Sequence, residues 1–152
     1  MSTIELTTVI PAPIERCFDL SRDIDVHRGS MVASREEAVG GTTTGLIGLG
    51  EEVTWRARHF GLVWHMTSRI TEMRRPTWFV DEMLQGPFRS FRHEHRLEHR
   101  GEVTVMRDVV HYRLPLGLLG VLGDAVVIRW YLRHLLTTRN SYLFSTATAT
   151  AP

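Results

Sequence analysis

The chain has 152 residues, 43% of them hydrophobic and 23% charged, which fits one globular domain with a sizeable core. The formal net charge of +1 provides no electrostatic basis for binding nucleic acid or an anionic membrane surface. The single cysteine, Cys17, excludes an intrachain disulfide, and no apolar run approaches the roughly 20 residues of a membrane helix. Because no secretory signal opens the sequence either, we expect a cytoplasmic domain over residues 1–146 and a flexible tail over 147–152, without stable membrane insertion.

The first third of the chain predicts one strand, two short helices and an edge strand. Residues 3–10 alternate weakly between apolar and polar, which predicts a strand, and the Pro-Ala-Pro sequence after it ends that strand. Short helices are expected over 14–20 and 23–31, and an edge strand over 34–39. The glycine-rich segment 40–50 is expected to be a mobile apolar loop, which is either a lid over a binding site or a plain connection.

From residue 51 onward the pattern predicts a meander of long antiparallel strands. A two-residue turn at Phe60-Gly61 fixes the register of the first two strands. The pairs expected across this turn are Ala57–Trp64, Trp55–Met66 and Val53–Ser68. The pairs expected across the next turn, at residues 73–76, are Ile70–Phe79 and Ser68–Asp81. In this register every inward position meets an inward position on the neighbouring strand.

The most informative stretch is the hairpin at residues 86–117, where Gly101-Glu102 has the composition of a type II′ turn. The pairs expected across this turn are Arg100–Val103, Leu97–Met106, His95–Asp108, His93–Val110 and Phe91–Tyr112. Charged side chains alternate along the other face of the earlier strand. His93 and His95 therefore lie on the same strand face as the apolar residues, which predicts that they and Asp108 point inward.

A second acidic residue is expected beside these histidines. A three-residue loop at 86–88 would place Asp81 opposite His93, whereas a two-residue loop would bring in Glu82 instead. The first alternative agrees with the register of the preceding strand. It predicts two acid–histidine pairs in adjacent rows, Asp81–His93 and Asp108–His95.

Residues 122–144 predict a long helix around which the bent sheet would wrap. The apolar face expected for this helix comprises Val121, Ala125, Ile128, Tyr131, Leu132, Leu135, Tyr142 and Leu143. Arg139 projects into the middle of this face, whereas Asn140 projects elsewhere, and the residues from Ser145 onward are expected to fray. Trp130 lies on the polar side of the helix, where it is either a homodimer contact or an isolated exposed side chain.

The inward polar residues allow several interpretations, because a buried polar group without a partner costs about 1–3 kcal/mol. They form a closed hydrogen-bond network, or they recognise a polar group on an apolar ligand. A third alternative is acid–base catalysis, with His95 as the general base, Asp108 holding its imidazole and Tyr112 stabilising an oxyanion. Two histidines on one strand face could also bind a metal, but only one clear third ligand is present, so neither a metal nor a cofactor is expected.

Four stretches, IPAPIERCFDL, GLIGLGEEVTWRARHFG, FVDEMLQGPFRSFRHEHRLE and DVVHYRLPLG, resemble the SRPBCC (START/Bet v 1-like) superfamily. More narrowly, they resemble bacterial polyketide cyclase/dehydrase-like or ligand-binding SRPBCC domains. The resemblance covers nearly the whole chain and implies an α+β helix-grip fold, with about seven antiparallel strands curved around a long C-terminal helix and two short helices after strand 1. It also implies a cavity for apolar molecules. Met83 and Phe91 stand where Gln and Trp are expected in this subgroup, which implies a less polar pocket.

The first functional expectation is that the chain binds a small hydrophobic ligand, such as a lipid, quinone or polyketide-like molecule, without a cofactor. The ligand-binding residues expected are Trp55, Trp64, Met66, Phe79, Asp81, Met83, Phe91, His93, His95, Asp108, Tyr112, Ile128, Tyr131, Leu135 and Arg139. The second expectation is a cofactor-free cyclase or dehydratase that uses His95, Asp108 and Tyr112. The third is a protein-interaction module with a vestigial pocket.

Overall fold

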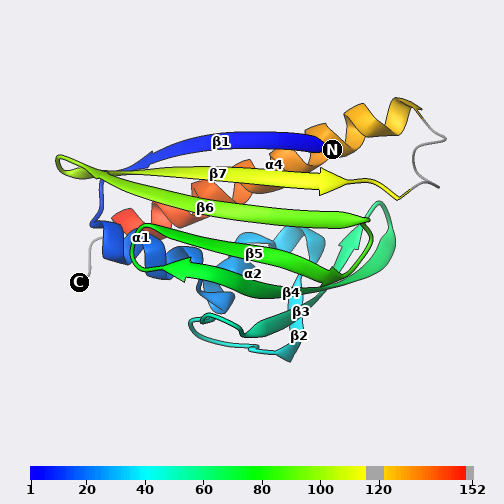
Figure 1. Ribbon diagram of the computed structural model, residues 1–152, viewed down its shortest axis with the longest axis horizontal. Helices are drawn as coiled ribbons and strands as arrows, with labels where there is room; N and C mark the ends of the chain where they lie inside the picture. Colours follow the sequence, from blue (N-terminus) through cyan, green and yellow to red (C-terminus); the bar gives the residue numbers. More distant parts are fainter. Residues whose placement is uncertain (116–121, 150–152) are drawn as a thin grey trace.

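A seven-stranded antiparallel sheet, in the order β1-β7-β6-β5-β4-β3-β2, forms the body of the molecule (Figure 1). The computed structural model describes residues 1–115 and 122–149, with side chains in the second range from residue 125 onward. The elements are β1 (Ser2–Ile10), α1 (Ile14–Ser21), α2 (Ile24–Ser30), the short 3-10 helix η1 (Val32–Ser34), β2 (Glu37–Gly41), β3 (Glu52–His59), β4 (Leu62–Arg74), β5 (Trp78–Gln85), β6 (Ser90–Arg100), β7 (Val103–Arg113) and α4 (Leu122–Thr148).

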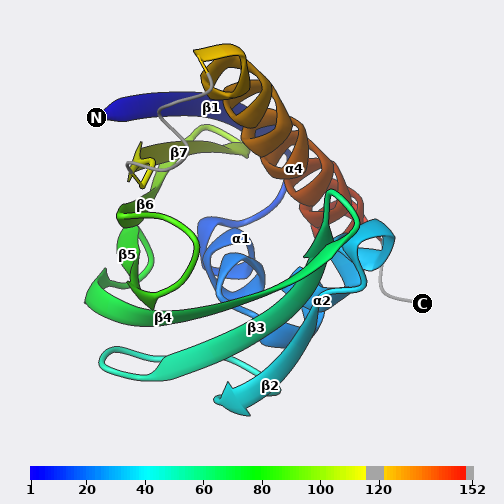
Figure 2. The same ribbon diagram turned by 90° about the vertical axis from the view of Figure 1, so that its right-hand side faces the viewer.

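The sheet curves around a single long helix. Figure 2 shows the strands bending from β1 round to β2, with α4 running across the concave side and α1 and α2 near one end of it. The helix α4 contacts β1, α1 and α2. The predicted α+β helix-grip fold, with two short helices after the first strand, is therefore confirmed.

Three of the four predicted registers are confirmed. Every pair expected between β3 and β4 is present, and so is every pair expected between β6 and β7. The connection between β5 and β6 is longer than the three residues expected, because β5 ends at Gln85 and β6 begins at Ser90. Its consequence is nevertheless confirmed, since Asp81 lies opposite His93.

The register expected between β4 and β5 is wrong. Ile70 lies opposite Asp81 rather than Phe79, and Ser68 lies opposite Met83 rather than Asp81. The turn comes later than expected, because Arg74 still pairs with Trp78, and the pairing then shifts between Ile70 and Glu72. Such a bulge adds one residue to one strand and displaces every pair beyond it.

The glycine-rich segment after β2 is attached to the start of α2. The backbone N–H of Ile24 donates to Gly45 O at 2.9 Å, and that of Ile47 donates to Arg22 O at 3.1 Å. The Ile47 side chain is buried in the core. At Gly41, φ is +70° and a Cβ would lie 2.1 Å from Glu52 O, so this position requires glycine. The role of residues 40–50 as a lid stays a prediction.

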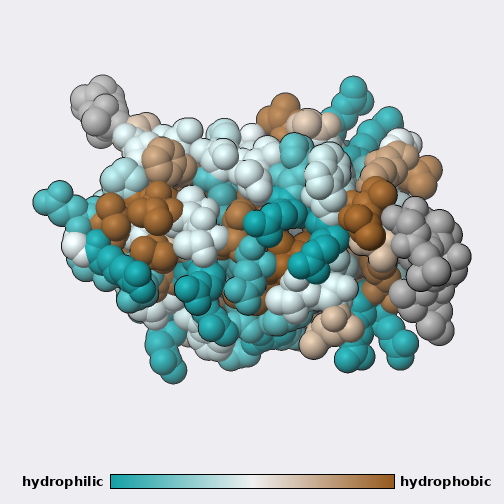
Figure 3. Space-filling model, turned by 90° about the horizontal axis from the view of Figure 1, so that it is seen from above, coloured by the Kyte–Doolittle hydropathy of each residue, from teal (hydrophilic) through white to brown (hydrophobic). Residues whose placement is uncertain are grey.

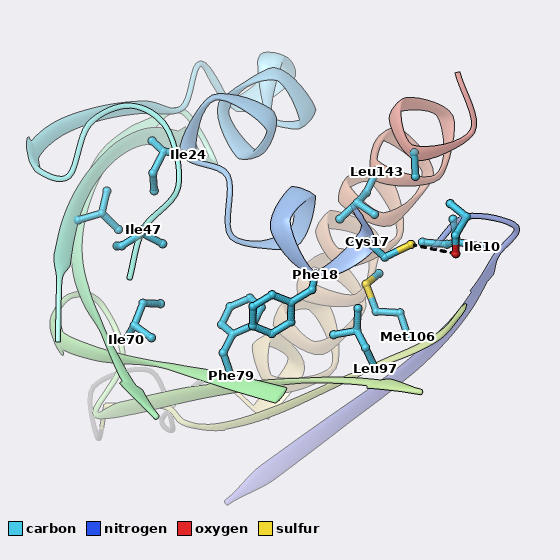
Figure 4. Packing of buried hydrophobic residues seen from close by; sticks show 13 residues of the cluster. Ile10, Cys17, Phe18, Ile24, Ile47, Ile70, Phe79, Leu97, Met106 and Leu143 are labelled. Atoms are coloured by element: carbon cyan, nitrogen blue, oxygen red, sulfur yellow. Dashed lines mark hydrogen bonds between the residues drawn. The ribbon is translucent and has the colours of Figure 1, made fainter. Parts of the chain in front are cut away.

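Buried hydrophobic side chains form two clusters. The first joins α1 to the sheet and to the C-terminal half of α4, and Figure 4 shows the rings of Phe18 and Phe79 in contact within it. Their centroids lie 5.4 Å apart at an interplanar angle of 82°. The second cluster contains Ile4, Val110 and Tyr112. Cys17 is fully buried in the first cluster, and this burial raises the pKa of its thiol.

The helix α4 differs from the prediction at its end and on its face. It continues to Thr148 rather than ending near residue 144, because Arg16 donates to the carbonyls of Thr146 and Ala147 in the last turn. Ala125 is exposed and Tyr142 is 42% exposed, so neither lies within the apolar face. Val121, which was also placed there, lies outside the described residues.

Trp130 is 66% exposed on α4, on the outer side of the helix as expected, and its indole stacks on the His134 ring at 5.7 Å. Figure 3 shows that hydrophobic side chains on the face above β1 and α4 occur in separate patches among hydrophilic ones. The homodimer contact at Trp130 stays a prediction. None of the described helices has the length and apolar character needed to cross a membrane.

Candidate functional site

A cavity of about 530 Å³ lies between the concave face of the sheet and α4. Hydrophobic and aromatic side chains from both core clusters make up most of its wall. The predicted ligand-binding residues that line it are Trp55, Trp64, Met66, Phe79, Asp81, Phe91, His93, His95, Ile128, Tyr131, Leu135 and Arg139.

Three predicted site residues do not line this cavity. Asp108 is wholly buried behind it, and Tyr112 is packed into the second cluster, where Phe88 contacts its ring at 5.9 Å. Met83 belongs to β5, and its side chain packs against Gly86 in the connection that follows this strand. Strand alternation decides which face a side chain takes, but it does not decide which inward side chain reaches the cavity and which is covered by another.

The cavity also has polar residues that the sequence reasoning missed. His27 Nε2 lies 2.7 Å from Glu36 Oε1, and the His27 ring packs against Trp55 at 4.4 Å. At the end of β3, His59 Nδ1 lies 2.6 Å from the Tyr131 hydroxyl. His59 shares strand parity with Trp55, so the alternation could have identified it, whereas no comparable signal marks His27.

The centre of the site is a pair of closely packed, tilted imidazoles on β6. Because alternate residues of a strand share a face, His93 and His95 both point inward, and their ring centroids lie 3.8 Å apart. Phe79 on β5 stacks on His95 at 4.0 Å and an interplanar angle of 9°. These contacts fix both rings, so the positions of their nitrogen atoms are set by packing.

On one side of this pair, Asp108 is the centre of a closed hydrogen-bond network. Its Oδ1 lies 2.8 Å from His93 Nε2, 3.2 Å from His95 Nδ1 and 3.3 Å from Arg139 Nη1. Its Oδ2 accepts from Asn140 Nδ2 at 2.7 Å. Burial alone would raise the pKa of Asp108, but the hydrogen bond from His93 and the charge of Arg139 hold it well below its usual value.

Asn140 is therefore a residue that the prediction placed wrongly. It was expected away from the apolar face of α4, but its side chain is 2% exposed and bonds Asp108, Arg139 and Thr8. Arg139 lies next to it, buried as expected, and donates to Ser21 O at 3.0 Å. The helix thus presents two polar side chains to the buried carboxylate.

On the other side of the imidazole pair, Asp81 is partly open, with 24% of its side chain exposed. Its Oδ2 lies 3.1 Å from His95 Nε2 but 3.9 Å from His93 Nδ1, which is too long for a hydrogen bond. Burial would raise the pKa of Asp81, but the hydrogen bond from His95 outweighs it and lowers the pKa. Asp81 is therefore a carboxylate at neutral pH.

The predicted acid–histidine pairs match the backbone register, but the closest side-chain contacts cross between them. Asp81 lies opposite His93 and Asp108 lies opposite His95 in the ladder. The shortest contacts instead join His93 to Asp108 and His95 to Asp81. Diagonal neighbours in a sheet are within reach of long side chains, and because the two rings are only 3.8 Å apart, each carboxylate lies near both imidazoles.

The protonation of His93 follows from these contacts. Burial, together with the neighbouring His95, lowers the pKa of His93, so its imidazole is neutral at pH 7. The short contact to Asp108 assigns the proton to Nε2, because a carboxylate accepts and does not donate. Nδ1 then carries a lone pair, and no donor among the described residues bonds it.

Asp81, His93 and His95 also offer the donor set of a metal site, with one ligand atom each and all three atoms within 4.8 Å of one another. The geometry suits a metal poorly. A metal would have to replace the hydrogen bond that joins His95 Nε2 to Asp81 Oδ2 at 3.1 Å.

No protein-family model matches the chain, and no curated protein matches it. Solved structures match over almost its whole length. TTHA0849 from Thermus thermophilus has a TM-score of 0.74 at 18% identity, covering 97% of this chain and 100% of its own. A START superfamily protein from Mycobacterium smegmatis has a TM-score of 0.73 at 10% identity, covering 95% and 96%.

A third match is to ginseng major latex-like protein 151 from Panax ginseng, with a TM-score of 0.69 at 12% identity, covering 97% of this chain and 98% of the other. The chain has an SRPBCC fold. Identities this low show the fold alone. Within the SRPBCC fold, the function of this chain has to be argued from its own cavity.

Proposed function

We propose that the protein binds a hydrophobic small molecule, such as a lipid, a quinone or a polyketide-like compound, in the cavity between the sheet and α4. The observation that carries this proposal is a cavity of about 530 Å³ whose wall is mostly apolar and includes a polar cluster of Asp81, His93 and His95. Pockets for small molecules commonly combine an apolar wall with a few placed polar groups. The resemblance to ligand-binding SRPBCC domains agrees with it.

The wall provides the affinity in this proposal. Trp55, Trp64 and Leu135 line the cavity and are only partly buried in the absence of a ligand. A ligand that covers them transfers its own apolar surface from water, which contributes about 0.8 kcal/mol for each buried CH₂ group. The polar residues then set the orientation of the ligand.

The contact between the β3–β4 hairpin and α4 is the proposed place of entry. Phe60 at the hairpin tip packs on the Tyr131 ring at 4.6 Å, and His59 bonds its hydroxyl. Phe60 is nevertheless 63% exposed, so few contacts hold it. Segments with few buried contacts open at low free energy, which would let a ligand pass without unfolding the sheet.

A general-base role for His95 has no comparable support. Both of its ring nitrogens lie within 3.2 Å of a carboxylate oxygen. Tyr112, the predicted oxyanion donor, does not line the cavity. We therefore propose binding and not acid–base catalysis.

A thermal-shift screen with fatty alcohols, quinones and polyketide mimics tests this proposal. A ligand at 100 times its Kd should raise the Tm by about 5–10 °C. Leu135→Trp should fill part of the cavity and weaken binding at least about tenfold. The ligand and the indole would compete for the same space, and the overpacking should cost more than about 1.4 kcal/mol of binding free energy, which is tenfold in affinity. Thr138→Trp, on the exposed side of the same helix, is the matched control and should bind normally. Equal binding by both variants would place the ligand elsewhere.

A further inference from the structure

Two acceptors on the cavity wall, Asp81 and His93, lie at a separation that suits one shared donor. Asp81 Oδ2 and His93 Nδ1 are 3.9 Å apart and do not bond each other. An atom about 2.8 Å from both would lie within hydrogen-bond distance of each, whereas the two acceptors cannot satisfy one another. Both residues line the cavity, so a ligand can reach this point.

The nearby positive charge is already engaged on the other side of the imidazoles. The Arg139 guanidinium donates to Asp108, Asn140 and Ser21 O. His27, the next histidine on the wall, is bonded to Glu36. The Asp81 carboxylate therefore has His95 as its only hydrogen-bond donor among the described side chains.

The other polar groups on this wall do not reverse the balance, because Arg22, its second cation, already bonds Asp19 and Ile47 O. Ser68 on β4 lines the cavity and is buried, and a hydroxyl accepts as readily as it donates. An anionic ligand group placed beside Asp81 would be buried next to a like charge, with no free cation among the described side chains of the wall, which is strongly unfavourable. A donor group meets two acceptors at the same place.

We infer that the polar group of the ligand is a hydrogen-bond donor, an ammonium or a hydroxyl group, held between Asp81 and His93, and that carboxylates are excluded. This inference rests on the proposed function and specifies its ligand class. An ammonium group has several N–H donors and can bond both acceptors at once, whereas a hydroxyl group has one proton and bonds one of them. Amines should therefore bind more tightly than alcohols of the same shape.

Isothermal titration of a matched naphthalene series tests the inference, with the protein first dialysed against EDTA. The compounds are naphthylmethylamine, naphthylmethanol, its methyl ether and naphthoate, which share one apolar body. The amine should bind at least about tenfold more tightly than the ether, because hydrogen bonds to charged groups contribute the most. Naphthoate should bind more weakly than the ether.

The variant Asp81→Asn separates this inference from a general effect on the cavity. It should weaken amine binding about tenfold and leave ether binding within about twofold, because the wall is unchanged. Asp25→Asn, an exposed residue on α2, is the matched control and should change neither.

Two results would overturn the inference while leaving cavity binding intact. One is equal affinity for the amine and the ether. The other is preferential binding of naphthoate, including binding that requires added Zn²⁺, which would make the cluster a metal site instead. Failure of all four compounds, the ether included, would instead contradict the proposed function on which the inference rests.

Discussion

Two carboxylates face the same pair of imidazoles, and they differ in what lies on their far side. Asp108 is wholly buried and meets Arg139 and Asn140 from α4, so that both of its oxygens are bonded. Asp81 meets the cavity and has one hydrogen bond, from His95. The same residue types therefore form a structural network on one side and an open binding surface on the other. The depth of each residue, and not its chemical type, makes this difference.

The largest expected effect on stability comes from the closed side of the imidazole pair, where Asp108 meets Arg139 and Asn140. Asp108→Ala should lower the free energy of unfolding by about 3–5 kcal/mol, because it leaves the buried Arg139 guanidinium without its carboxylate. Urea unfolding followed by circular dichroism measures this loss. The control is Glu98→Ala, which removes an exposed ion pair with Arg100 and should cost less than about 1 kcal/mol. Similar losses in the two variants would show that Asp108 is not the centre of the network.

Asn140 extends the same test to the helix. Asn140→Ala should destabilise the protein by about 1–3 kcal/mol, because Asp108 Oδ2 loses its amide donor. Thr138→Ala, at an exposed position two residues earlier, should change stability by less than about 0.5 kcal/mol. If both variants unfold at the same urea concentration, α4 does not contribute to the network through Asn140.

The pH dependence of the free energy of unfolding should be set by His93, which is hydrogen-bonded to the buried Asp108. The folded-state pKa of His93 is below its usual value of 6.5, so the unfolded chain takes up a proton first as the pH falls. Stability should therefore be highest above pH 6.5 and should decline below it, by at most about 1.4 kcal/mol per pH unit for one proton. The groups that face His93 are Asp108, Asp81 and His95, with Arg139 behind Asp108.

Urea midpoints measured from pH 8 to pH 5 check this dependence. His93→Gln should flatten the decline, whereas His99→Gln, exposed on the same strand, should retain it. Asp81 and Asp108 both have lowered pKa values, so their contribution is lost only at lower pH, below about 3.8. A midpoint that does not change between pH 8 and pH 5 would contradict the neutral state of His93.

The smallest expected effect on stability comes from the open side of the imidazole pair, where Asp81 faces the cavity. Asp81→Asn keeps the shape of the side chain and removes one partly exposed hydrogen-bonded charge, so it should change the free energy of unfolding by less than about 1 kcal/mol. The same urea experiment measures it. A loss as large as that of Asp108→Ala would mean that both carboxylates are structural and that the difference between the two sides does not exist.

The sequence predicted the parts of this site that depend on strand alternation. His93 and His95 face inward because residues two apart share a face, and the Gly101 turn, where φ is +62°, fixes the partner strand. The bulge near Thr71 could not be predicted, because no glycine or proline marks it. The pairs of Ile70 were displaced by the later turn, since Arg74 still pairs with Trp78, and the bulge then moved them back by one residue.

Other features depend on packing between distant segments. A helical projection placed Asn140 at the polar edge of α4, and nothing in that periodicity indicates that a buried carboxylate on β7 faces it. The same limit applies to Tyr112, whose inward parity was right but whose ring is covered by other side chains. Residues near the cavity were thus predictable as a set, but their order from wall to interior was not.

The most direct test of the difference between the two carboxylates is a long-range ¹H–¹⁵N spectrum of the histidine side chains at pH 7. We predict that His93 carries its proton on Nε2 and that the bare Nδ1 shifts when naphthylmethylamine is added but not when the methyl ether is added. A proton on Nδ1 in the free protein would contradict this prediction. So would an Nδ1 chemical shift that stays unchanged when the amine saturates the protein.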